Sequence, residues 1–135
     1  MKAKEFLQQV KKITFEIMML ESELKELYSP ISAVRFDNVP GIPDPDATLH
    51  IVERIGIIQE RYRSKLAELI QKRNECVNII QQMQDEKAEE VIYLRYVEFK
   101  SFGQIARVMN YSKERIFQLQ REGLKEIDAI LEALQ

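Results

Sequence analysis

An unbroken repeat of apolar residues between Ala3 and Leu27 constrains the fold more than any other feature of this sequence. Its spacings alternate between three and four residues, and its members are Ala3, Phe6, Val10, Ile13, Ile17, Leu20, Leu24 and Leu27. Such spacing places these side chains along one seam of an α-helix. A seam of this length is stable in water only when another helix covers it, so the sequence predicts a pair of long helices.

A second helical pattern runs from Pro45 to about residue 84 and supplies the expected partner. Its seam consists of Val52, Ile55, Tyr62, Leu66, Leu69, Cys76, Ile80 and Met83. The segment at about 28–46 contains all four prolines, which predicts a long loop in which Asp44 is the N-cap of the second helix. We therefore expect residues 1–84 to form an antiparallel, coiled-coil-like helical hairpin with a Pro/Gly-rich loop.

The second helix is expected to be much longer than the first, so part of its seam should stay uncovered. Further apolar residues beside this seam widen the apolar face, and they are Ile57, Ile58, Ile70, Val77 and Ile79. Two covers remain open for this face: the C-terminal domain, or a second copy of the chain in a homodimer formed through the hairpin.

Residues 85–135 hold three helical patterns separated by short breaks, so we expect an all-α chain that ends in a three-helix domain. Asp85, Ser101 and Ser112 are placed to cap the three helices, because their side-chain oxygens accept hydrogen bonds from free backbone N–H groups. Ser101 and Gln104 also have the spacing of a capping box.

The break between the last two helices has the chemistry of a helix-turn-helix. The first helix of that motif needs a small side chain where the backbones approach, and Ala106 provides it. Four residues later the chain must reverse at a residue that tolerates positive φ, and Asn110 meets this requirement. Ser112 then caps the following helix. Core contacts are expected from Ile105, Met109, Ile116 and Leu119.

The distribution of charge favours this turn as a place where nucleic acid binds, although the whole chain has a net charge of -2 and a pI of about 5.6. Residues 1–84 are balanced, with 12 basic and 12 acidic side chains. Residues 101–121 carry Arg107, Lys113, Arg115 and Arg121 against Glu114 alone, which is a local balance of +3. The basic excess therefore coincides with the turn.

The last helix is strongly amphipathic. Its apolar stripe consists of Ile116, Leu119, Gly123, Ile127, Ile130 and Leu134, and its polar side carries Glu114, Gln118, Arg121 and Lys125. Side chains of these polar types read base edges in the major groove. Because Gly123 lies in the middle of the apolar stripe, we interpret it as a position of close packing rather than a helix stop.

The stretch SFGQIARVMNYSKERIFQLQREGLKEI, preceded by YLRYVEF, resembles region four of bacterial sigma factors over roughly residues 85–130. The resemblance implies that Lys113, Glu114 and Gln118 read a −35 promoter element in the major groove and that Arg115 lies near the DNA backbone. Phe117 departs from the family pattern, in which arginine is usual. It would contact either a thymine methyl group or another protein.

The expected DNA-binding surface combines these base readers with residues that contact phosphates, such as Lys100 and Arg121. Its members are Lys100, Ser101, Gln104, Ser112, Lys113, Glu114, Arg115, Phe117, Gln118 and Arg121. Their expected partner is double-stranded DNA of a promoter or operator. No cofactor and no metal ion is expected.

The whole chain, with its hairpin and loop ahead of the turn, resembles small phage and conjugative-element proteins related to transcription regulators of the ArpU and RinA type. A hairpin replaces the sigma-factor region that melts the −10 element, so a complete sigma factor is not expected. The resemblance implies a regulator whose hairpin either forms a homodimer or engages RNA polymerase.

Other classes of function are less compatible with the sequence. His50 and Cys76 are each the only residue of their kind and have no partners for catalysis or zinc binding, so we do not expect an enzyme. No apolar run reaches the ~18 residues of a membrane helix, and we expect a cytoplasmic protein. The alternative is a helical adaptor that binds protein partners without reading bases.

Overall fold

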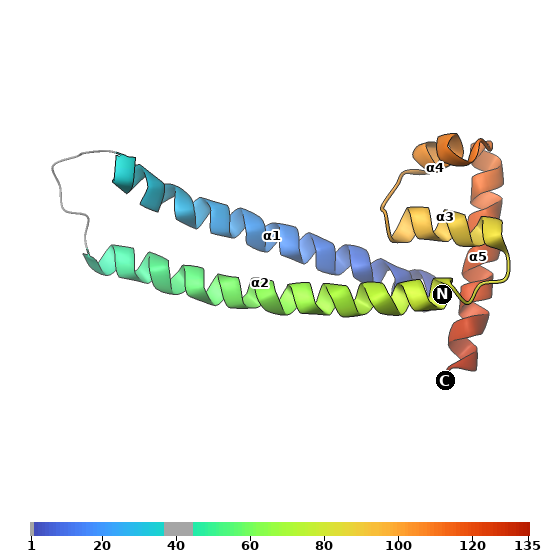
Figure 1. Ribbon diagram of the computed structural model, residues 1–135, viewed down its shortest axis with the longest axis horizontal. Coiled ribbons are helices and arrows are strands. Elements are labelled where there is room, and N and C mark those ends of the chain that lie inside the picture. Colours follow the sequence, from blue (N-terminus) through green and yellow to red (C-terminus); the bar gives the residue numbers. More distant parts are fainter. Residues whose placement is uncertain (1, 37–44) are drawn as a thin grey trace. The chain divides into compact units, whose positions relative to one another are not determined.

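The structure, a computed structural model, describes residues 2–36 and 45–135, with side chains described outside 30–36 and 45. Its elements are the helices α1 (Lys2–Phe36), α2 (Pro45–Ile80), α3 (Glu86–Tyr96), α4 (Phe102–Met109) and α5 (Lys113–Ala133) (Figure 1). Two long packed helices followed by three shorter ones confirm the predicted all-α fold. Within those ranges, no helix is both long enough and apolar enough to cross a bilayer.

The chain divides into two compact units, each of which contains part of both long helices. One unit is Ile13–Glu68, and the other joins the chain up to Lys12 with Leu69–Gln135. We call the first the hairpin unit and the second the turn unit. The sequence-based boundary at residue 84 remains a prediction, and the turn unit includes the first turns of α1 and the last turns of α2 as well as α3 to α5.

In the hairpin unit, polar pairs between α1 and α2 flank the apolar seam. The Arg54 guanidinium lies 2.8 Å from the Glu23 carboxylate, and Lys65 forms an ion pair with Glu16. The Tyr62 hydroxyl donates a hydrogen bond to Glu21 over 2.9 Å. This bond raises the pKa of Tyr62, because it stabilises the protonated phenol beside a carboxylate. These pairs sit in solvent and contribute little stability, so the apolar seam holds the helices together.

Of the predicted seam of α1, Ala3, Val10, Ile13 and Ile17 are buried, whereas Phe6, Leu20, Leu24 and Leu27 are partly buried. Leu7 is a further buried residue beside this seam. The predicted seam of α2 is wrong at its start, because Val52 is 53% exposed whereas Ile58, which the sequence pattern places beside the seam, is 2% exposed. Each step of three residues rotates the side chain by about 60° around a helix. With Ile55 and Ile58 facing α1, Val52 is turned to the edge of the contact.

The expected difference in length between the two long helices is also wrong. Helix α1 has 35 residues and α2 has 36. The reason is that α1 continues past Leu27 to Phe36, before the closely spaced Pro40, Gly41 and Pro43. Unequal length therefore gives no argument for a second copy of the chain. The loop predicted at about 28–46 is therefore wrong over residues 28–36, which belong to α1, and over Pro45 and Asp46, which begin α2. The predicted N-cap Asp44 and the rest of the predicted loop, 37–44, lie outside the described residues.

The turn unit has a core that joins the ends of α1 and α2 to α3 and α5. Its buried members are Ala3, Leu7, Val10, Cys76, Ile79, Ile80, Met83, Ala88, Ile92, Tyr96, Val97, Leu124 and Ile127. Polar contacts reinforce it: the Ala3 backbone N–H donates to Asp128 over 2.7 Å, and the Gln84 backbone N–H donates to Glu126. The first turns of α1 are thus fixed against the C-terminal helices.

Gly123 is a position of close packing, as the sequence predicted, and its neighbour is Ile92 of α3. A Cβ atom at this position would lie 2.7 Å from Cγ1 of Ile92, which is itself fully buried. Leu134, which the sequence pattern places in the same apolar stripe, is instead 65% exposed, because it follows the last residue of α5.

We expect Gly123→Ala to destabilise the turn unit by about 1–2 kcal/mol, since overpacking against Ile92 outweighs the gain in helix propensity. Gly56 is the matched control, because it lies inside α2 with no atom within 4 Å of the methyl group that alanine would add. Gly56→Ala should be neutral or stabilising. Denaturant unfolding followed by circular dichroism measures both changes, and equal effects would contradict close packing at Gly123.

We also expect the thiol of Cys76 to be unreactive in the folded protein. Burial raises the pKa of this thiol to about 11, so the reactive thiolate is scarce at pH 8. Colorimetric titration with an aromatic disulfide reagent at pH 8 should label Cys76 slowly in buffer and rapidly in guanidinium chloride. Fast labelling in buffer would mean that the ends of α1 and α2 separate readily.

Candidate nucleic-acid interface

The turn between α4 and α5 has the geometry that its sequence predicted. Asn110 ends α4 in the left-handed region, with φ 59° and ψ 44°, and its backbone N–H donates to the carbonyl of Ala106. The Tyr111 N–H donates to the same carbonyl over 3.0 Å. The Ser112 hydroxyl then accepts a hydrogen bond from the Arg115 N–H over 3.2 Å and caps α5. The direction of α5 is therefore set by local backbone bonds.

A capping box starts α4, also as predicted. The Ser101 hydroxyl accepts from the Gln104 N–H over 3.2 Å, and the Gln104 side-chain oxygen accepts from the Ser101 N–H over 2.9 Å. Asp85 caps α3 by accepting from the N–H groups of Lys87 and Ala88. Ser101, Gln104 and Ser112 thus have structural roles in the protein alone, and their contacts with DNA remain predictions.

A small apolar cluster supports the turn from inside. Its buried members are Val91, Leu94, Ile105, Ile116 and Leu119. Ile105, Ile116 and Leu119 are fully buried, which confirms their predicted role. Because residues from α3, α4 and α5 all contribute, the three helices are held as one body and the outer face of α5 is fixed in place.

The outer face of α5 is polar and exposed. Its exposed side chains include Lys113, Glu114, Arg115, Gln118 and Arg121. Within the described part of the chain, no ion pair within 4.0 Å engages the basic members of this set. The Gln118 amide donates to Glu122 over 3.2 Å, a surface bond that water or a base edge can replace. The charges of this face are therefore directed to solvent, where a ligand can reach them.

Phe117 lies on the same face and is supported by a neighbour that the sequence pattern does not indicate. Its ring meets that of Phe102 edge to face, with centroids 4.8 Å apart and an interplanar angle of 62°. The Arg95 guanidinium lies 4.1 Å from the centre of the Phe102 ring and donates to the Lys100 carbonyl over 3.1 Å. Phe117 is 39% exposed, so its ring packs against Phe102 and is also accessible to solvent.

The linker between α3 and α4 contains a second feature that the sequence did not indicate. Phe99 has φ 58°, a conformation that is uncommon for an aromatic residue. It lines a pocket of about 180 Å³ together with Phe102 and residues from α1, α3 and α5. No local pattern signals this arrangement, because it depends on contacts between segments that are distant in the sequence.

This region of the chain matches a known protein family. Residues 85–128 match the model of the family "Sigma-70, region 4". The match identifies a Sigma-70 region 4 domain in α3, α4 and most of α5, in agreement with the resemblance seen in the sequence, and it covers none of α1 or α2. No curated protein and no solved structure matches the chain significantly.

We expect Asn110→Ala to destabilise the turn unit by about 1–2 kcal/mol, because alanine is strained in the left-handed region. Asn110→Gly is the matched control and should leave stability nearly unchanged, since glycine adopts positive φ without strain. Thermal and denaturant unfolding of the two variants measure the difference. Equal stability of both variants would show that the conformation of residue 110 does not determine the turn.

Proposed function

We infer that this chain, which carries a Sigma-70 region 4 domain at residues 85–128, binds double-stranded DNA and regulates transcription. The observation that carries this proposal is the exposed polar face of α5. The helix is capped by Ser112 and is held in place by a buried cluster. Among the residues described, no ion pair engages the basic side chains of this face. An α-helix of this kind fits the major groove.

The roles follow from the chemistry of each exposed side chain. Lys113 donates to guanine, Glu114 accepts from cytosine and Gln118 pairs with adenine through two hydrogen bonds. Arg115, Arg121 and Lys100 contact phosphates, which position the helix without specifying sequence. The hydroxyls of Ser101 and Ser112 and the Gln104 amide lie at helix N-termini, where phosphates are favoured by the free N–H groups and the helix dipole.

Phe117 is an apolar side chain among the polar side chains that we expect to read bases. The ring of Phe117 packs edge to face on Phe102, so its conformation is already restricted and little side-chain entropy is lost when a ligand binds. We assign it contact with a thymine methyl group, which an apolar side chain recognises in the major groove. An aromatic residue in place of arginine also predicts that the target differs from the usual −35 element.

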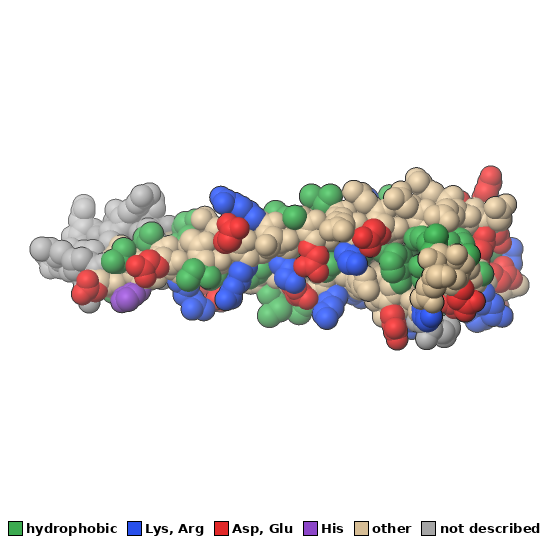
Figure 2. All heavy atoms as spheres, turned by 90° about the horizontal axis from the view of Figure 1, so that it is seen from below, with side chains coloured by type: hydrophobic (Ala, Val, Ile, Leu, Met, Phe, Trp, Pro, Cys, Tyr) green, Lys and Arg blue, Asp and Glu red, His purple; other side chains and the backbone are tan. Residues whose placement is uncertain are grey.

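Two long helices precede the Sigma-70 region 4 match, and this layout supports a role as a transcription regulator. We propose that it belongs to the phage or mobile-element type of transcription regulators and acts in the cytoplasm, as the layout of its sequence suggests. Basic and acidic side chains are interspersed on the visible face of the long helices, so this face does not have the basic excess that favours DNA (Figure 2). The hairpin is better suited to protein contacts.

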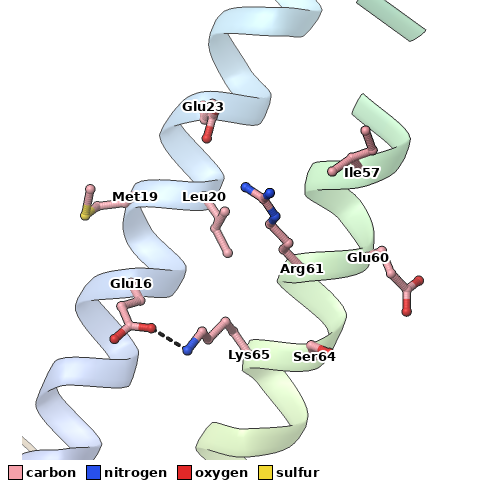
Figure 3. Close-up of a pocket in the computed structure, with 9 residues that line it drawn as sticks. All are labelled: Glu16, Met19, Leu20, Glu23, Ile57, Glu60, Arg61, Ser64 and Lys65. Atoms are coloured by element: carbon pink, nitrogen blue, oxygen red, sulfur yellow. Dashed lines mark ion pairs between the residues drawn. The ribbon is translucent and has the colours of Figure 1, made fainter. Parts of the chain in front are cut away.

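An apolar groove in the hairpin unit supports such a contact. It is lined by the apolar residues Met19, Leu20 and Ile57 and by the polar residues Glu16, Glu23, Glu60, Arg61, Ser64 and Lys65, and the side chains of Arg61 and Lys65 extend between the two helices (Figure 3). Met19 is 57% exposed and Ile57 is 56% exposed. Because the lining carries both acidic and basic side chains, the groove of one copy can form ion pairs with the same groove of a second copy in a two-fold dimer. We therefore assign this groove to a homodimer. Engagement of RNA polymerase is the competing role.

We expect Gln118→Ala to weaken binding to the preferred DNA site by about 1–3 kcal/mol and to change binding to random DNA little. Glu122→Ala is the matched control, because it removes the hydrogen-bond partner of Gln118 but leaves the amide in place. Fluorescence anisotropy on both duplexes measures the losses. An equal loss on the two sequences would remove Gln118 from base reading.

We expect the protein to show a dimer mass by light scattering at tens of micromolar concentration, because a single reader with a local charge of +3 binds weakly and a dimer gains avidity. Combined Met19→Lys and Ile57→Lys substitutions should give the monomer mass. Ile70→Lys is the control, since Ile70 is 60% exposed but does not line the groove. A monomer mass for the unmodified protein would leave the adaptor or polymerase role for the hairpin.

A further inference from the structure

The 180 Å³ pocket of the turn unit has an unusual set of charges for a chain with a net charge of -2. All the charged residues that line it are basic: Lys4 and Lys11 from α1, and Arg95 from α3. Its remaining lining residues are aromatic rings and amides, and they include Phe99, Phe102 and Gln120. A pocket with three cations and no carboxylate is a site for an anion.

Lys4 and Lys11 are held at this pocket by the packing of the first turns of α1. They are seven residues apart, which places both on the same side of the helix two turns from each other. Ala3, Leu7 and Val10 anchor the adjoining face of the helix in the core of the turn unit. The bond from the Ala3 N–H to Asp128 fixes the start of the helix on α5. Both lysines are exposed, so their charges are available to a ligand.

The pocket is linked through Phe102 to the outer face of α5. Phe102 lines the pocket and also packs against Phe117 of the reading face, with ring centroids 4.8 Å apart. Arg95 lines the pocket and donates to the carbonyl of Lys100, which precedes the capping box of α4. Cations at the edge of a base-reading helix are in the position where the sugar-phosphate backbone passes.

The conformation of Phe99 supports a built site. Its φ of 58° is strained for a residue other than glycine, and strained residues cluster at functional sites such as ligand clamps. The ring of Phe99 is 40% exposed at the pocket instead of being withdrawn into the core. An exposed ring beside cations provides an apolar wall against which a deoxyribose can pack.

We propose that Lys4 and Lys11 of α1, together with Arg95, form a phosphate-binding site for the DNA backbone beside the base-reading helix. This inference rests on the proposed DNA-binding function and extends it to a helix that the Sigma-70 region 4 match does not include. The first turns of α1 then have two roles, since Ala3, Leu7 and Val10 close the core and the adjoining Lys4 and Lys11 neutralise phosphates.

The test compares the full chain with a Lys4→Gln/Lys11→Gln variant on two duplexes, the preferred site selected from a random pool and a random sequence of equal length. Dissociation constants are measured by anisotropy over a series of salt concentrations. The slope of log K against log salt is negative, and each lost phosphate contact reduces its magnitude by about 0.9, so the slope of the variant should be less steep by about 1.8. Its affinity should fall by the same factor on both duplexes, because phosphates carry no sequence information.

The matched control is Lys12→Gln/Lys25→Gln, which changes the net charge equally at exposed positions that do not line the pocket. Its slope should equal that of the unmodified protein. If both variants lose slope alike, the effect is one of net charge and the site is overturned. Thermal unfolding of each variant checks that the fold is retained, and Lys4→Arg/Lys11→Arg, which keeps the charges, should restore the slope.

The remaining outcomes separate this inference from the function on which it rests. Sequence-preferring binding with an unchanged slope in the Lys4/Lys11 variant overturns the phosphate site and leaves the DNA-binding function standing. An unchanged slope with weaker binding to core RNA polymerase assigns the cations to an acidic protein surface instead. Failure of the unmodified protein to bind either duplex overturns both proposals.

Discussion

The buried stripe of α5 is the interaction on which the rest of the turn unit depends. Ile116 and Leu119, near the start of the stripe, close the cluster beneath the turn between α4 and α5. Leu124 and Ile127, further along, close the larger core that holds the ends of α1 and α2. Gly123 lies between the two pairs and allows α3 to approach closely. One helix therefore fixes its own outer face and packs against the ends of α1 and α2 that belong to the turn unit.

This arrangement explains why a chain with a small negative net charge can present a basic surface. In the hairpin unit, Arg54 and Lys65 are paired with carboxylates of the facing helix. On α5 the stripe occupies the inward side, and the basic side chains are left on the outward side without ion pairs among the residues described. The position of each charge, rather than the total, decides which surface attracts DNA.

Features that depend on neighbouring residues were predictable from the sequence. The caps at Asp85, Ser101 and Ser112 and the left-handed Asn110 follow from local backbone chemistry, which the residue type largely determines. The role of Gly123 was predictable because it interrupts an apolar stripe. The reading face of α5 was predictable in its residues and exposure, whereas its contacts with bases remain a proposal.

Features that depend on packing between distant segments were not predictable in the same way. Ile58 rather than Val52 lies in the seam because of the way in which α2 is turned about its own axis where it faces α1, and a short apolar pattern does not define that orientation. The continuation of α1 to Phe36 was not predictable, because it passes Pro30 and proline is unfavourable inside a helix. The pairing of Phe102 with Phe117 and the meeting of Lys4, Lys11 and Arg95 join residues from different helices.

Sequence reading by the face of α5 is tested most directly by selecting bound duplexes from a random pool with the purified full chain. We expect enrichment of one motif that is only a few base pairs long for each copy of the reading helix. Two such motifs in inverted orientation would indicate a dimer, and one motif at a fixed distance from a −10 element would indicate action with polymerase. Recovery of duplexes with no enriched motif, although binding is tight at low salt, would contradict base reading by this helix.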